Sequence, residues 1–188
     1  MLNNIAAILD AGIPAATNSY ESIMTANGTG SSNTISFTAI PSTYKHLQIR
    51  GIVKSTTSGS SFSSVGLNFN ADTSSSYTRH LAWGDGSTAY AYGQASAGTT
   101  WYIGANDFPS AGYTSIVGAH VVDILDYTNT NKNTTVRALT GCDVNGAGEV
   151  ALSSTVYLKT NAITSIELVA ASGNFSTLTQ YALYGIKG

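Results

Sequence analysis

The chain has 188 residues, of which only 10% are charged, against roughly 25% in ordinary soluble proteins. Its net charge of −2 and its eight scattered Lys and Arg residues exclude the basic stripe that would bind a nucleic-acid backbone directly. A single cysteine, Cys142, excludes an intrachain disulfide and a Cys-based structural zinc site, so the fold must be held together by packing. The length predicts one main domain.

Residues 1–19 predict an N-terminal docking arm and linker. Ile5, Ile8 and Leu9 follow one another at the helical spacing i, i+3, i+4, and Gly12 and Pro14 end this short apolar turn. The apolar run is too short to cross a bilayer and lacks the basic start of a signal peptide, so no membrane association is expected. The arm either folds back on its own domain or docks on another subunit. Its predicted docking residues are Leu2, Ile5, Ile8 and Leu9.

Residues 20–188 predict an all-β domain, an antiparallel jelly-roll-like β-sandwich. Short alternations of apolar and polar residues, typical of half-buried strands, are separated by clusters of Gly, Asn, Ser and Asp. Residues 121–125 carry apolar side chains on both faces, which predicts a central strand or one covered at a subunit interface. The predicted strands span residues 20–26, 33–40, 46–55, 65–70, 77–83, 89–92, 100–103, 113–127, 134–139, 149–158, 163–170 and 179–187.

The connections between these strands are polar. Segments 56–61 and 72–76 are rich in Ser and Thr and are expected at loop tips, and 104–112 is expected to be a long irregular loop. Asn145-Gly146 lies between apolar segments and predicts a tight hairpin turn, because both central residues of such a turn need positive φ. This pattern is a turn rather than a calcium loop, since Glu149 comes too early to be the bidentate ligand.

No motif in the sequence predicts catalysis, a metal or a cofactor. There is no Gly-x-Ser-x-Gly and no phosphate-binding glycine loop, so we expect a protein that is not an enzyme. His46, His80 and His120 lie far apart in the sequence, and none has a second ligand at metal-binding spacing. His46 and His120 are therefore expected to be hydrogen-bonded strand residues.

Two aspartates lie in a strongly apolar strand. Asp123 and Asp126 are three residues apart and point to opposite faces of the strand, so they cannot form a catalytic carboxylate pair by themselves. Arg137 or Lys132 is expected to pair with one of them across the turn at 129–133.

Aromatic residues are concentrated in the middle of the chain, and 11 of the 18 aromatics are Tyr. Aromatic platforms beside acidic and amide side chains can stack on sugar rings, which suggests a glycan-binding groove. The same side chains are common in β-sandwich cores and at protein interfaces, which is the favoured interpretation. The glycan-binding interpretation would use Trp83, Asp85, Tyr92 and Trp101.

Four segments carry a family resemblance: YKHLQIRG at 44–51, DILDYTNTNKNTTVR at 123–137, ITSIELVA at 163–170 and YALYGIKG at 181–188. In this order they resemble segments of small virion structural proteins of tailed bacteriophages. The resemblance implies jelly-roll domains that assemble as trimers, on the capsid surface or within tail fibres.

The first expectation from this resemblance is a capsid decoration or cement protein located in the virion. It would bind the major capsid protein at the outer capsid surface as a homotrimer and stabilise the head. The residue pattern predicts Val122, Ile124 and Tyr184 at the subunit interface. The alternative is a tail-fibre or baseplate component that binds a host-surface glycan or receptor.

Overall fold

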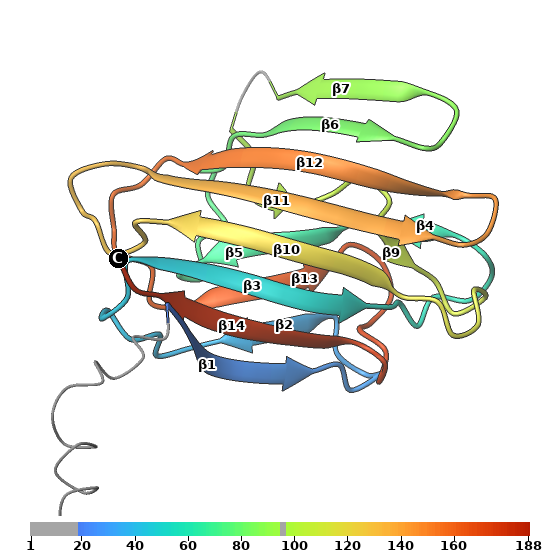
Figure 1. The fold of residues 1–188 in the computed structure, drawn as a ribbon, viewed down its shortest axis with the longest axis horizontal. Coiled ribbons are helices and arrows are strands. Elements are labelled where there is room, and N and C mark those ends of the chain that lie inside the picture. The colour runs from blue at the N-terminus through green and yellow to red at the C-terminus, as the bar shows by residue number, and fades with distance from the viewer. Residues whose placement is uncertain (1–18, 95–96) are drawn as a thin grey trace, which may run out of the picture.

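The computed structural model describes residues 19–94 and 97–188, and the four predicted docking residues of the N-terminal arm lie outside these ranges. Figure 1 shows an antiparallel β-sandwich, as predicted, whose two layers differ in width. The wide layer is an eight-stranded sheet in the order β1 (Tyr20–Asn27), β14 (Gln180–Ile186), β3 (His46–Val53), β10 (Gly118–Leu125), β11 (Thr134–Asp143), β12 (Gly148–Tyr157), β6 (His80–Gly84) and β7 (Ala89–Gly93).

The narrow layer covers one face of the wide sheet. It consists of four strands in the order β2 (Thr34–Phe37), β13 (Ile166–Ala170), β5 (Val65–Phe69) and β8 (Trp101–Tyr102). A two-stranded ribbon of β4 (Phe62–Ser63) and β9 (Phe108–Pro109) lies at one end of the sandwich in Figure 1.

The core lies between the two layers and follows the period-two alternation of the strands. On β3, Leu47, Ile49 and Val53 are buried, as the sequence pattern predicted. On β11, buried and exposed residues alternate along most of the strand. The central strands of the wide sheet therefore have one apolar face toward the narrow sheet and one face on the molecular surface.

β10 is central in the wide sheet, as predicted, but it begins at Gly118 rather than at residue 113. The carbonyl groups of Ser110, Tyr113 and Ile116 accept hydrogen bonds from the buried ammonium group of Lys54 instead of entering a strand ladder. The segment 104–112, predicted to be one irregular loop, likewise contains the short strand β9 and the buried residue Phe108.

The hairpin between β11 and β12 has the predicted turn. Asn145 has φ 60° and Gly146 has φ 112°, and the Val144 N–H donates to the Ala147 carbonyl at 2.9 Å. Two central residues with positive φ are the requirement of the tight turn that matches strand twist.

The hairpin of β6 and β7 extends the wide sheet beyond the area that the narrow sheet covers, as Figure 1 shows at the top of the view. All five residues of β7 are exposed. Among the residues that the structure describes, no helix is long and apolar enough to span a membrane.

Candidate functional site

The outer face of the wide sheet carries an apolar surface. Leu139, Val150 and Leu152 on β11 and β12 are 53%, 59% and 58% exposed. Leu139 lies opposite Leu152 on one side and Val121 on the other. The surface continues over small residues of β11 and β6, since Val150 pairs with Gly141 and Leu152 with Ala82. We call this the outer apolar face, defined by Ile52, Ala82, Ala119, Val121, Leu139, Val150 and Leu152.

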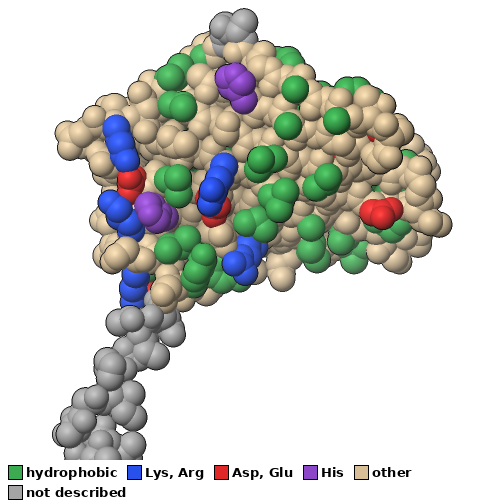
Figure 2. Space-filling model, turned by 45° about the horizontal axis from the view of Figure 1, so that its top comes forward, with side chains coloured by type: hydrophobic (Ala, Val, Ile, Leu, Met, Phe, Trp, Pro, Cys, Tyr) green, Lys and Arg blue, Asp and Glu red, His purple; other side chains and the backbone are tan. Residues whose placement is uncertain are grey.

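Soluble monomers rarely expose a contiguous apolar patch above a few hundred Å² unless it is an interaction site. In Figure 2, hydrophobic side chains spread across this face, while most charged side chains gather toward the left of the view. The outer apolar face is therefore a candidate interface with another protein.

A bonded row of polar side chains borders the outer apolar face. The Arg50 Nε–H donates to Gln48 at 2.6 Å, Gln48 Nε2 donates to Asp123 at 2.7 Å, and Arg137 pairs with Asp123 at 2.9 Å. Arg137 or Lys132 was predicted to pair with Asp123 or Asp126, and the structure contains both an Arg137–Asp123 and a Lys132–Asp126 pair. Asp123 neutralises Arg137 within the chain, whereas Arg50 bonds to the neutral amide of Gln48 and keeps its positive charge.

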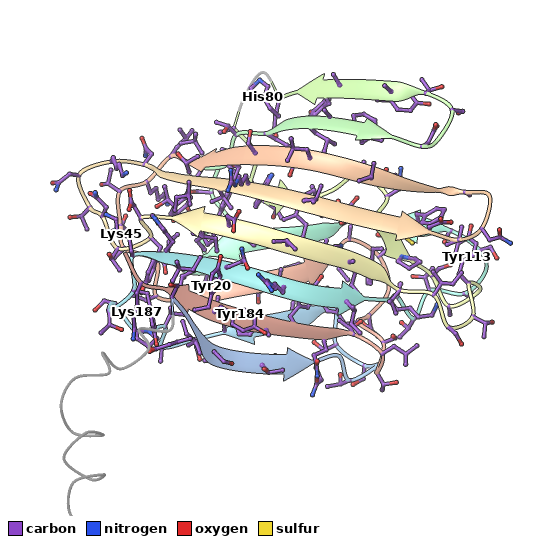
Figure 3. All side chains as sticks on the ribbon, in the orientation of Figure 1. Tyr20, Lys45, His80, Tyr113, Tyr184 and Lys187 are labelled. Carbon is purple, nitrogen blue, oxygen red and sulfur yellow. The ribbon has the colours of Figure 1, made fainter. Side chains whose placement is uncertain are left out.

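The Arg50 guanidinium also lies over two tyrosine rings. Its carbon is 5.7 Å from the ring centre of Tyr20 and 5.8 Å from that of Tyr184, within cation–π range. Figure 3 shows Tyr20 and Tyr184 close together on the neighbouring strands β1 and β14. Tyr184, predicted at a subunit interface, is thus on the outer surface of the wide sheet.

The other two residues predicted at the subunit interface are in the core. Val122 and Ile124 are fully buried between the two sheets, so they cannot form a surface between subunits. They alternate with Val121, Asp123 and Leu125 along β10, and the face bearing Asp123 is the outer one. The prediction chose the wrong face of a correctly placed strand.

Two of the predicted glycan-binding residues lie in a groove at the end of the wide sheet. Trp83 and Asp85 line an open groove of about 1430 Å³, together with Tyr90 and the turn 143–148. The rings of Trp83 and Tyr90 stack at 4.9 Å with an angle of 17° between their planes.

Asp85 closes the β6–β7 turn. Its carboxylate accepts hydrogen bonds from the Ser87 and Thr88 N–H groups, each at 2.8 Å, and from the Tyr90 hydroxyl at 3.1 Å. The backbone hydrogen bonds to Ser87 and Thr88 hold the pKa of Asp85 well below its usual range. Asp85 is therefore a fixed anion that positions Tyr90 at the rim of the groove.

The other two predicted glycan-binding residues, Tyr92 and Trp101, do not line this groove. Tyr92 is 47% exposed and lines a smaller neighbouring pocket, which shares Trp83 with the groove. Trp101 is fully buried on β8 and cannot contact a ligand. The predicted glycan-binding residues did not include Tyr90. Its pairing with Trp83 across the β6–β7 hairpin could have been found from the turn at 85–88.

A buried polar network of three side chains lies in the interior of the sandwich. His120 Nε2 is 2.6 Å from the Asp107 carboxylate, at ion-pair distance but without well-directed hydrogen-bond geometry, and the Tyr181 hydroxyl is 2.7 Å from His120 Nδ1. All three side chains are buried, and burial raises the pKa of Tyr181 well above its ordinary value. A substrate would not reach them, so the geometry favours a structural role.

Two further buried titratable groups lie near Asp107. Glu149 accepts the N–H groups of Ala105 and Asn106 at 3.0 and 2.7 Å, and burial raises the pKa of its carboxyl group. Burial likewise raises the pKa of the Cys142 thiol to about 11, which makes this cysteine a core filler rather than a nucleophile.

Within residues 19–94 and 97–188, no three His, Cys, Asp or Glu side chains are grouped so that they could hold a metal ion. No protein-family model matches the chain, and no curated protein matches it at a significant level.

Proposed function

We propose that this protein is a structural component of a tailed-bacteriophage virion, a capsid decoration or cement protein that binds the outer capsid surface as a homotrimer. The observation that carries the proposal is the outer apolar face, which a protein of this low charge leaves exposed in the single chain. The resemblance of four sequence segments to small phage virion proteins is the reason for proposing a virion and a trimer.

In this proposal the outer apolar face meets a neighbouring subunit, with Tyr184 at its edge. These residues replace Val122 and Ile124, which are part of the core. The N-terminal arm, with Leu2, Ile5, Ile8 and Leu9, remains the predicted contact with the major capsid protein. Three arms on one rigid trimer would bind several capsid subunits at once, and such multivalent attachment resists detachment more strongly than a single contact.

The direct test is occupancy on heads that lack this protein. The purified wild-type chain should cosediment with such heads to saturation and should raise the temperature at which they release their DNA. The double variant Leu139→Lys/Leu152→Lys should lose at least ten-fold in apparent affinity, because trimer formation precedes multivalent binding.

Leu178→Lys is the matched control, since Leu178 is 50% exposed but lies in the loop before β14. This variant should bind heads like the wild type. Absence of saturable binding by the wild-type chain, or equal losses in the double variant and the control, would contradict the proposal.

A second candidate function is a tail-fibre or baseplate component that binds a host-surface glycan. The observation that favours it is the groove lined by the Trp83–Tyr90 stack and by Asp85, because sugar sites combine an aromatic platform with fixed polar groups. A glycan array separates the two: saturable glycan binding that is lost in Trp83→Ala would favour the tail.

A further inference from the structure

The smaller pocket beside the groove has a guanidinium group in its wall. This pocket has a volume of about 350 Å³, at the lower end of the range for small-molecule sites. It lies on the inner side of the β6–β7 hairpin, where Leu81 of β6 and Tyr92 of β7 pair. Its lining includes Arg79, Leu81, Trp83, Tyr92, Tyr102 and Ala105.

The Arg79 guanidinium has hydrogen-bond donors to spare. Its Nη2 donates to the Gly104 carbonyl at 2.7 Å, and its buried Nε–H has no acceptor among the described residues. A guanidinium offers five N–H donors in a planar fork. Leaving a buried donor without an acceptor is unfavourable. Hydrogen bonds within the chain therefore do not fully satisfy the Arg79 guanidinium.

Two aromatic rings hold Arg79. The guanidinium carbon is 5.7 Å from the ring centre of Tyr92 and 5.9 Å from that of Tyr102. These two cation–π contacts restrain the guanidinium in the wall of the pocket.

No carboxylate of the described part of the chain forms an ion pair with Arg79. The nearby acids are already engaged, Asp107 with His120 and Glu149 with the backbone N–H groups of Ala105 and Asn106. The pocket lining itself contains no acidic side chain. The pocket therefore presents a single positive charge within an aromatic wall, which suits a ligand with one carboxylate and an apolar ring face.

We propose that this pocket binds an acidic sugar, a uronic acid type of residue at the end of a glycan. Its carboxylate would meet the Arg79 guanidinium in the two-pronged geometry that arginine favours, and its ring would pack against Trp83 and Tyr92. Because Trp83 lines both hollows, the following sugars of the same glycan would lie on the Trp83–Tyr90 stack. The inference rests on the second candidate function and names the substrate class of that site.

The test uses the full chain and two probes that differ in one group, methyl glucuronide and methyl glucoside. Ligand-observed NMR and calorimetry should show saturable binding of the glucuronide that is at least ten-fold tighter than that of the glucoside. Arg79→Gln should weaken glucuronide binding at least ten-fold, and Tyr92→Ala should weaken it several-fold.

Arg50→Gln and Tyr20→Ala are matched controls. Arg50 lies 5.7 Å from the Tyr20 ring centre, the same distance as Arg79 from Tyr92, and Tyr20 and Tyr92 are both 47% exposed. Both controls should bind the glucuronide like the wild type. Tyr92→Ala also keeps the test valid if Arg79→Gln does not fold, since Tyr92 lies on the exposed edge strand β7.

The inference is overturned if the wild type does not bind the glucuronide, if it binds the glucoside equally well, or if Arg50→Gln lowers affinity as much as Arg79→Gln. Neutral glycans bound on an array through Trp83, with no glucuronide binding, would overturn the acidic-sugar inference and leave the second candidate function standing. No glycan binding of any kind would overturn both.

Discussion

At the residue scale, the buried ammonium group of Lys54 determines where strand β10 can begin. It follows β3, is 5% exposed, and donates to the carbonyls of Ser110, Tyr113 and Ile116. Burial lowers the pKa of Lys54, but these three acceptors compensate the charged form. One side chain thus anchors the segment between β9 and β10.

Replacing Lys54 by Met should lower the free energy of unfolding by about 3 kcal/mol, because three carbonyl groups would lose their donor in a buried place. Urea unfolding followed by tryptophan fluorescence measures this change. Lys45→Met is the control: Lys45 is 55% exposed, and Asp126 keeps Lys132, so a loss below about 1 kcal/mol is expected. Equal losses in the two variants would contradict the anchoring role.

Asp126 makes stability depend on acid pH. Hydrogen bonds from Lys132 and from Lys45 lower the pKa of Asp126 from its ordinary 3.8 to about 2. A carboxyl group whose pKa is lower in the folded state stabilises the fold above the unfolded-state pKa, and this contribution disappears as the pH falls. Its contribution should therefore be complete above pH 3.8 and vanish as the pH falls toward 2.

Asp126→Asn tests this dependence and keeps a residue that tolerates the left-handed backbone at this position, where φ is 50°. Thermal unfolding should show a lower melting temperature for the variant at pH 6, and the two curves should converge near pH 2. A difference of the same size at both pH values would show that the carboxylate charge is not responsible.

At the scale of elements, Gly51 allows β3 and β14 to pack with Tyr181 between the sheets. A Cβ atom on Gly51 would lie 2.1 Å from the Tyr181 ring, so Gly51→Ala must displace that ring and its contact with His120. We expect a loss of about 2 kcal/mol in the free energy of unfolding, the usual range for an overpacked core.

Gly146→Ala is the comparison for this variant. The position has open space around it, and its cost comes from the positive φ alone, about 1 kcal/mol. Amide hydrogen exchange separates the two further, because only Gly51→Ala should speed exchange in β14. Faster β14 exchange in Gly146→Ala would contradict this assignment.

The elements themselves were largely predictable, because alternation and turn residues are local signals. The turn at Asn145-Gly146 and the pair of Arg137 with Asp123 follow from neighbouring sequence. The start of β10 at Gly118 does not, since it depends on a lysine more than fifty residues away. The burial of Trp101 likewise depends on which strands stack, which sequence patterns leave open.

The candidate surfaces were less predictable than the fold for the same reason. The pattern of β10 showed apolar residues on both faces, but it did not say which face meets the narrow sheet. The outer apolar face joins Leu139, Val150 and Leu152 with residues of three other strands through cross-strand registers. The pocket that contains Arg79 likewise combines residues of β6, β7 and β8 with Gly104 and Ala105.

At the scale of the whole molecule, low charge and an exposed apolar face predict association that does not depend on salt. The free chain of 19.4 kDa should have three times that mass in light scattering after size exclusion, if the homotrimer forms before it reaches a capsid. The contact is mainly apolar, and Arg137 and Asp123 at its border are paired within the chain. We therefore expect 1 M NaCl to leave the trimer intact even though it screens exposed charges beyond about 3 Å.

Leu139→Lys/Leu152→Lys should convert this trimer to a folded monomer, because six lysines would be placed at the contacts between three subunits. Circular dichroism should show an unchanged fold, since surface substitutions away from buried features usually change stability by less than about 0.5 kcal/mol. Leu178→Lys should remain trimeric. A wild-type chain that stays monomeric at every concentration, or a double variant that stays trimeric, would show that the outer apolar face serves a contact other than the one between subunits.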